Sequence, residues 1–89
     1  MYTYEIRPNL LKILEKLSKN DKILYERVMK KIEEVIKSYD VEHYKNLRYD
    51  MKDSKGVHIG HFVLVFKFDK KNNLIIFDDF DHHSKIYVS

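Results

Sequence analysis

A chain of 89 residues with 44% apolar and 13% aromatic residues suits one small folded domain and is too apolar for a disordered tail. It has no cysteine, which excludes disulfides and thiolate metal sites and fits a reducing compartment, and its net charge of +3 permits a nucleic-acid partner without requiring one. There is no apolar signal-peptide core, and no uncharged run reaches the ~20 residues of a membrane span. We therefore expect a cytoplasmic protein without membrane contact, with a single domain over residues 1–89.

A short edge strand is predicted at residues 2–6. Tyr2, Tyr4 and Ile6 fall on one face, because successive side chains of a strand point to opposite sides. Pro8 follows, and its fixed backbone angle suits the first turn of a helix. The chain is therefore expected to pass from this strand directly into a helix.

Two amphipathic helices are predicted after the strand. Leucine and isoleucine recur at helical spacing over residues 8–19, and a second stripe of apolar residues runs through residues 21–38. The pair Asn20-Asp21 between them is a helix start signal, because a short polar side chain can cap exposed backbone N–H groups. The two helices should form a hairpin with one apolar stripe each.

The second half of the chain reads as strands. Residues 61–68 and 74–80 are rich in β-branched and aromatic side chains, and the polar residues 69–73 between them predict an antiparallel hairpin. Residues 44–52 and 85–89 are weaker strand candidates. The predicted fold class is α+β, with a short N-terminal strand, a two-helix hairpin and then a three- to four-stranded antiparallel sheet covered by the helices on one face.

Symmetric closure of the loop at residues 69–73 predicts a register for this hairpin. Phe66 would lie opposite Ile76 and His61 opposite Asp81, and opposed residues share a face. Asp78 would then fall on the core face, which is unfavourable for a carboxylate, so a bulge or a shifted register there is an open alternative. The other face would expose four apolar side chains as a binding surface, namely Val63, Val65, Ile75 and Phe77.

Four of the five histidines lie between residues 58 and 83, and a tyrosine follows them. Imidazoles exchange protons near neutral pH and a neighbouring phenol can join them, so this cluster is a candidate acid/base site. Strand-end histidines are also commonly half-exposed polar residues, and the tyrosine could simply close the sheet. The cluster comprises His58, His61, His82, His83 and Tyr87.

A zinc site is the competing interpretation, since histidines and nearby aspartates are ligand types. In a strand, however, residues one or three positions apart point to opposite faces. Neither His58 with His61 nor His82 with His83 can then converge on one ion without a turn. We therefore expect no metal site.

A basic stretch precedes the central strand. Cations and stackable rings suit a nucleic-acid backbone and its bases, and two tyrosines are interleaved with the cations here. Two aspartates partly cancel the charge, and an ordinary solvated loop would look the same. The cations are Lys45, Arg48, Lys52 and Lys55.

In this order the features resemble the RelE/ParE superfamily of type II toxins, in particular its RelE and YafQ branch. The likeness covers nearly the whole chain. Its most specific parts are a Gly-x-x-apolar-Leu-apolar-aromatic strand, here Gly60 to Phe66, and an ending of His or Arg, two residues, an apolar residue and an aromatic, here His83 to Tyr87.

The resemblance implies an mRNA endoribonuclease that cuts in the ribosomal A site and thereby inhibits translation. In this family no metal or small-molecule cofactor is used. The 2′-hydroxyl attacks the adjacent phosphate and leaves a cyclic phosphate or its 3′-phosphate product. The implied partners are mRNA on the ribosome and a small RelB/DinJ-like antitoxin that silences the toxin.

The resemblance also implies site residues. His83 and Tyr87 match the family's C-terminal acid/base pair, and His61 matches a polar position that opens the central strand; these three are the predicted catalytic residues. Which group donates and which accepts a proton stays open. The predicted RNA- and phosphate-binding residues are Lys45, Arg48, Lys52, Lys55, His58 and His82.

The chain departs from the family where many relatives carry arginines. It has Val63 in the central strand and an acidic run at residues 78–81 before the closing aromatic. The histidines could supply the missing cations, activity could be weak, or the chain could be a relative that only binds antitoxin. A ParE-like inhibitor of DNA gyrase and a stand-alone module for a partner protein are further alternatives, although ParE members commonly lack the pair that His83 and Tyr87 match.

Overall fold

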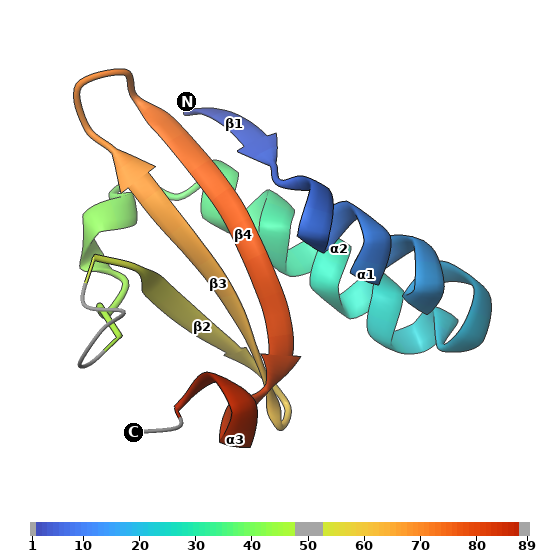
Figure 1. The fold of residues 1–89 in the computed structure, drawn as a ribbon. Helices are drawn as coiled ribbons and strands as arrows, with labels where there is room; N and C mark the ends of the chain where they lie inside the picture. The colour runs from blue at the N-terminus through green and yellow to red at the C-terminus, as the bar shows by residue number, and fades with distance from the viewer. Residues whose placement is uncertain (1, 48–52, 88–89) are drawn as a thin grey trace.

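The structure is a computed structural model that describes residues 2–47 and 53–87. Helices α1 and α2 lie side by side across one face of a four-stranded sheet, and α3 lies where β4 ends (Figure 1). No helix in these two ranges is long and apolar enough to cross a membrane. The elements in chain order are β1 (Thr3–Ile6), α1 (Pro8–Asn20), α2 (Lys22–Ile36), a 3-10 helix (Val41–His43), β2 (Lys55–Ile59), β3 (Phe62–Asp69), β4 (Leu74–His82) and α3 (His83–Ile86).

Both predicted long helices are confirmed, with ends that differ by one or two residues from the expected ranges. Helix α1 begins at Pro8, as the missing N–H of proline favours. Asp21 separates the two helices. Its backbone N–H donates to the carbonyl of Leu17 at 2.8 Å and its carboxylate accepts from the N–H of Leu24 at 3.2 Å. One residue therefore ends α1 and caps α2, which makes the hairpin tight.

The sheet has the order β1-β4-β3-β2 and is mixed. Strands β2, β3 and β4 are antiparallel as predicted, whereas β1 pairs with β4 in parallel. Antiparallel strands can be joined by a short turn, but parallel neighbours need a long connection. Here the helical hairpin and two further strands separate β1 from β4 in the chain. This long connection lets β4 lie parallel to β1, which forms the edge of the sheet.

The two weaker strand predictions are wrong where the structure describes them. The strand before the central hairpin is Lys55–Ile59, and within residues 44–47 only an isolated bridge from Asn46 to Lys55 forms. At the other end, residues 83–86 are helical. The ring nitrogen Nδ1 of His82 accepts the N–H of Ser84 at 3.2 Å, which caps a short helix that strand propensity does not predict.

The predicted register of the β3–β4 hairpin is wrong by one residue beside the loop and by two residues beyond the bulge, where Val63 instead of His61 pairs with Asp81. The alternative of a bulge is confirmed. Phe66 pairs with Phe77 instead of Ile76, because the loop uses four residues, 70–73. The register then shifts between Val65 and Phe66, so that Val65 pairs with Asp79 and Asp78 is left without a partner in the ladder. The extra residue pairs Leu64 of the core face with Phe80, whereas an unbroken ladder would have brought Asp79 to that position.

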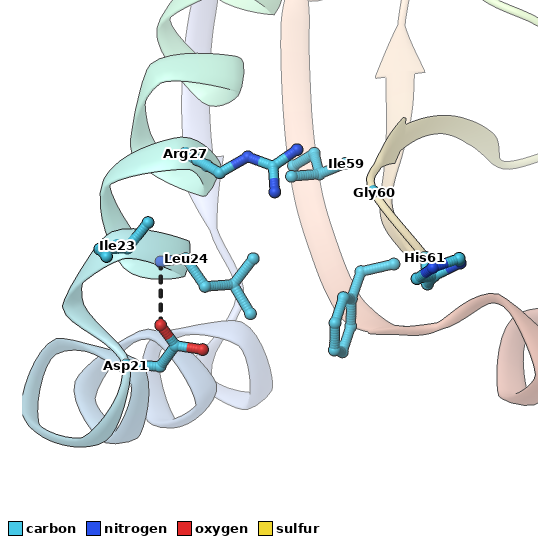
Figure 2. Close-up of a pocket in the computed structure, with 8 residues that line it drawn as sticks. Asp21, Ile23, Leu24, Arg27, Ile59, Gly60 and His61 are labelled. Atoms are coloured by element: carbon cyan, nitrogen blue, oxygen red, sulfur yellow. Dashed lines mark hydrogen bonds between the residues drawn. The ribbon is translucent and has the colours of Figure 1, made fainter.

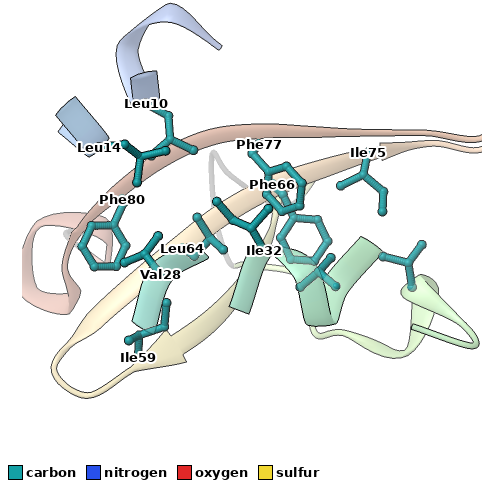
Figure 3. Packing of buried hydrophobic residues seen from close by; sticks show 12 residues of the cluster. Leu10, Leu14, Val28, Ile32, Ile59, Leu64, Phe66, Ile75, Phe77 and Phe80 are labelled. Carbon is teal, nitrogen blue, oxygen red and sulfur yellow. The ribbon is translucent and has the colours of Figure 1, made fainter. Parts of the chain in front are cut away.

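The core lies between the sheet and the two long helices. Leu10 and Leu14 of α1 and Val28 of α2 pack over aromatic side chains of β3 and β4 (Figure 3). The corrected register puts Ile75 and Phe77 into this core, where both are fully buried. They therefore cannot belong to the open apolar face that the sequence predicted.

The opposite face of the sheet carries a second, smaller cluster. Val63 and Val65 are fully buried there, beneath Leu47 and the C-terminal Ile86. A Cβ on Gly56 would meet Leu47 Cδ2 at 2.7 Å, so the glycine is what lets Leu47 approach the sheet. The predicted open surface is thus closed by two segments from outside the strands, and one of them is α3.

Candidate functional site

Three imidazoles meet at the end of the sheet where the β2–β3 turn approaches α3. We call His61, His82 and His83 the histidine cluster. The ring centroid of His61 lies 6.2 Å from that of His82 and 6.3 Å from that of His83, and the last two are 4.5 Å apart. His82 and His83 were expected to diverge unless a turn intervened, and the start of α3 at His83 supplies that turn.

Backbone geometry holds this cluster in place. Gly60 has a φ of 61°, which glycine adopts without a steric penalty, and with His61 it forms the turn between β2 and β3. The carbonyl of His61 accepts the N–H of His83 at 2.8 Å. The turn is therefore tied directly to the first residue of α3.

His82 has a structural task within the cluster. Its Nδ1 accepts the backbone N–H of Ser84 at 3.2 Å and lies 2.9 Å from the Ser84 hydroxyl. A ring nitrogen that accepts a backbone N–H carries no proton itself, so the neutral imidazole has its proton on Nε2. The predicted contact of His82 with RNA remains a prediction, and only Nε2 is available for it.

Tyr87 lies next to His58 on the face of the sheet away from the long helices. The two rings are stacked with centroids 5.9 Å apart and an interplanar angle of 29°. His58 pairs with Val63 in the ladder, and Ile86 packs on the same cluster as Val63, so burial of Ile86 anchors the residue next to Tyr87. The Tyr87 side chain is 43% exposed and can meet a ligand.

The structure therefore groups the predicted catalytic residues in two neighbouring sets. His61 and His83 belong to the histidine cluster, whereas Tyr87 has its ring contact with His58, which was predicted to bind RNA. Helix α3 joins the sets, since the N–H of Tyr87 donates to the carbonyl of His83 at 2.9 Å. The predicted group of imidazoles and a phenol is thus divided into the His58–Tyr87 pair and the histidine cluster.

The predicted cations differ in what they contact. The ammonium group of Lys55 donates to the carbonyls of Glu42 and Tyr44 at 3.3 and 3.0 Å and to Asn46 Oδ1 at 2.9 Å. Lys55 therefore braces the segment before β2. The side chain of Lys45 is exposed, and its carbonyl accepts the N–H of Gly56 at 3.2 Å. The predicted sites Arg48 and Lys52 lie outside the described residues.

The aspartates near the site are engaged by local donors. Asp79 Oδ1 accepts from Asn9 Nδ2 at 3.1 Å and from the N–H of Phe80 at 2.8 Å, and Asp81 Oδ1 accepts from the N–H of His82 at 2.7 Å. These hydrogen bonds partly offset the negative charge of the two carboxylates near the end of β4. Among residues 2–47 and 53–87, no group of three or more His, Asp or Glu side chains is placed to hold a metal ion.

Tyr44 belongs to the packing rather than to the site. Its ring meets Phe66 edge-on at a centroid distance of 5.6 Å. Burial raises the pKa of the Tyr44 phenol, and the nearby Glu34 carboxylate adds to this effect. Tyr44 is therefore held in its neutral form.

A pocket of about 270 Å³ opens on the other side of His61, between the start of α2 and the β2–β3 turn (Figure 2). Arg27 of α2 is its cation. The sequence offers little reason to single out this arginine among many helical cations. Its one signal is that it directly precedes Val28, at the border of the apolar stripe.

Two archaeal proteins are similar to the chain over almost its full length. A Methanocaldococcus jannaschii protein named "Putative toxin RelE4" is 52% identical over 88 residues, which are 98% of this chain and 92% of that protein. An uncharacterized protein of Methanosarcina mazei is 41% identical over 88 residues, which are 98% of this chain and all of that protein (100%). No family model matches the chain.

Solved structures share the fold. The toxin–antitoxin complex RelBE2 of Mycobacterium tuberculosis contains a chain with a TM-score of 0.71 and 19% identity, with 93% of this chain and 92% of that chain covered. The isolated RelE toxin of Escherichia coli gives a TM-score of 0.69 at 21% identity, with 98% and 92% covered. Together with the 52% identity to an archaeal RelE protein, this shows that the chain belongs to the RelE toxin family.

Proposed function

We propose that this protein is the toxin of a type II toxin–antitoxin system and that it cuts mRNA on the ribosome without a metal ion. Such a nuclease inhibits translation and acts in the cytoplasm, where ribosomes are. The observation that carries the proposal is the stacked pair of Tyr87 and His58, because it places a phenol and an imidazole together on an exposed part of the sheet.

Cleavage by the 2′-hydroxyl requires two proton transfers. A base takes the proton of the attacking hydroxyl and an acid protonates the departing 5′-oxygen. At neutral pH an imidazole can accept a proton, whereas a phenol can donate one. We assign Tyr87 as the acid. His58, which touches its ring, and His83, one helical turn away, are the two candidates for the base.

The phosphorane that forms between these steps carries extra negative charge, which nearby donors must stabilise. In this proposal His61 and His82 Nε2 supply donors from the histidine cluster, and Lys45, Arg48 and Lys52 supply cations from the basic stretch. Lys55 contributes by bracing residues 42–46, since its ammonium group already has three oxygen partners.

The proposed protein partner is a small RelB/DinJ-like antitoxin. Structures of relatives are named as complexes of toxin with antitoxin, which supports such a partner here. The face with Val63 and Val65 is closed by Leu47 and Ile86, so the helical hairpin is the better candidate surface. Its exposed apolar side chains include Leu11 of α1, which is 51% exposed.

Induced expression in a bacterial host, followed by primer extension on a translated message, tests the proposal. Cuts at defined codon positions in wild type, absent in Tyr87→Phe, are expected. Halted replication with intact mRNA would instead favour a gyrase inhibitor, and normal growth would favour a partner-binding module. A purified-ribosome assay at constant free Mg²⁺, with and without EDTA, then tests the independence from zinc and other metals that EDTA binds more tightly than Mg²⁺, and unchanged cleavage is expected.

A further inference from the structure

The pocket beside His61 has an apolar wall, and no other part of the described chain occupies the space in front of that wall. Leu24 of α2 and Ile59 of β2 line it (Figure 2), and so does Phe62 of β3. Ile23 stands at the rim, with 77% of its surface exposed. Pockets for drug-sized ligands measure about 300–1,000 Å³. At about 270 Å³ this one suits a smaller group, such as a single planar base.

A guanidinium group stands over the turn that forms the opposite side of this pocket. The Arg27 nitrogens lie 3.5 and 3.7 Å from the point where a Cβ of Gly60 would be, so the guanidinium reaches to within ordinary contact distance of the turn. None of the ion pairs among the described residues involves Arg27. Its charge and its donors are available to a ligand.

His61 connects the pocket to the candidate active site. The same residue lines the pocket and belongs to the histidine cluster, where it lies 6.2 Å from His82. A strand of RNA bound at the cluster would therefore pass the mouth of the pocket at its next nucleotide. A polyanion that continues from the site meets the Arg27 cation there, while the Asp21 carboxylate in the same lining already accepts the N–H of Leu24. The cation argues for a nucleotide as the occupant.

We propose that this pocket is a subsite for one nucleotide of the RNA substrate, next to the cleaved linkage. The base packs on Leu24 and Phe62, and the Arg27 guanidinium holds the phosphate. Single-stranded nucleic acid is commonly held in this way, by stacking on apolar or aromatic surface and by cations along the backbone. The subsite rests on the proposed function, because it presumes that RNA is bound at the histidine cluster.

Binding can be measured apart from cleavage. The probe is a hexanucleotide with 2′-O-methyl groups, which lacks the attacking hydroxyl and cannot be cut by the proposed reaction. Titration of the wild-type chain should shift the NMR methyl signals of Ile23 and Leu24 with saturation. Arg27→Ala should weaken binding about five- to tenfold, as expected for one exposed charge-assisted contact. It should also make the slope of log affinity against log salt shallower by about 0.7.

Arg7→Ala is the matched control. Arg7 is exposed like Arg27, but it lies beside Glu5 at 3.6 Å and does not line the pocket. It should leave affinity and salt slope unchanged. A change that merely lowered net charge by one would move both variants alike, and that result would overturn the subsite. Unshifted Leu24 methyl signals in the presence of bound RNA would overturn it as well.

The kinetics separate this subsite from the proposed function. In a cleavage assay Arg27→Ala should raise KM with kcat close to wild type, because it removes binding rather than proton transfer. If wild type cuts no RNA, the proposed function fails, and the titration still decides whether the pocket takes a nucleotide. Leu24 signals that respond to an antitoxin peptide but not to RNA would assign the pocket to a protein partner and refute the subsite.

Discussion

The rings of His58 and Tyr87 stack with their centroids 5.9 Å apart, one on a strand and the other just beyond the short C-terminal helix. This contact depends on Ile86, which packs on Val63 and Val65 and so fixes the residue that precedes Tyr87. The proposed acid/base pair thus consists of two exposed side chains whose segments are held by packing against Val63 and Val65.

Replacing Tyr87 by Phe tests the acid of this pair. Phenylalanine keeps the ring against His58 and removes only the hydroxyl, so folding should be unchanged. Because general acid catalysis contributes about 10²–10⁴-fold, cleavage on the ribosome should fall within that range, with a lower kcat and a similar KM. The thermal unfolding midpoint serves as the control for folding. Cleavage at the wild-type rate would remove Tyr87 from the chemistry.

The proton acceptor can be identified by comparing His58→Gln with His83→Gln. Glutamine can still form hydrogen bonds but cannot exchange a proton near neutral pH, so only the base should lose cleavage by about 10²-fold or more. His58 is expected to be the base, because it contacts the Tyr87 ring directly. The acidic limb of the profile of kcat/KM against pH should disappear in that variant alone. A loss confined to His83→Gln would transfer the role to the histidine cluster.

The long helices could be predicted from sequence because their apolar spacing and the Asp21 cap are local signals. The hairpin register could not. Residues 74–80 alternate equally well in either register, and the bulge at Asp78 then places Phe80, instead of Asp79, opposite Leu64 on the core face. That preference emerges only when both strands and the helices above them are packed together.

The contact between His58 and Tyr87 could not be predicted either, for a related reason. The sequence predicts a strand at Tyr87, but Nδ1 of His82 caps a short helix that ends the strand before this residue. Imidazole is not among the usual capping groups, so the helix has no ordinary start signal. The predicted histidines His61, His82 and His83 do form one cluster, whereas the ring contact of Tyr87 is with His58.

The capping role of His82 predicts different results for two substitutions. Asparagine is a strong N-cap residue and alanine a weak one, a difference of about 1 kcal/mol at an exposed helix start. His82→Asn should therefore keep amide exchange of Tyr87 slow, since its N–H bonds to the His83 carbonyl, while His82→Ala should accelerate it. If both variants lose RNA affinity equally, His82 Nε2 also binds RNA. Equal exchange rates in wild type and His82→Ala would refute the cap.

Gly56 should tolerate no larger residue while Leu47 is present. A Cβ at this position would lie 2.7 Å from Leu47 Cδ2 and 3.0 Å from Val63 Cγ1, and overpacking of this kind typically costs about 1–3 kcal/mol. Urea unfolding of Gly56→Ala should show a loss in this range. Combined with Leu47→Ala, the cost of Gly56→Ala should largely vanish, because the clashing methyl group is gone. Additive costs in the double variant would mean that backbone freedom, not contact, requires the glycine.

The β3–β4 loop predicts a pH-dependent contribution to stability. The pKa of Asp69 is lowered chiefly by a hydrogen bond from the Asn72 side chain, at 2.7 Å, and also by the Asn72 backbone N–H. A carboxyl whose pKa is lower in the folded state stabilises the fold above its unfolded pKa, and this stabilisation is lost as pH falls through the folded pKa. Asn72→Ala should therefore lower the urea midpoint at neutral pH and make no difference well below pH 3.8, the reference value for Asp69. The same substitution in an Asp69→Asn background is the control and should have a smaller effect at neutral pH. A loss of stability in Asn72→Ala that persisted unchanged into acid would show that the asparagine acts through the turn backbone and not through the Asp69 carboxylate.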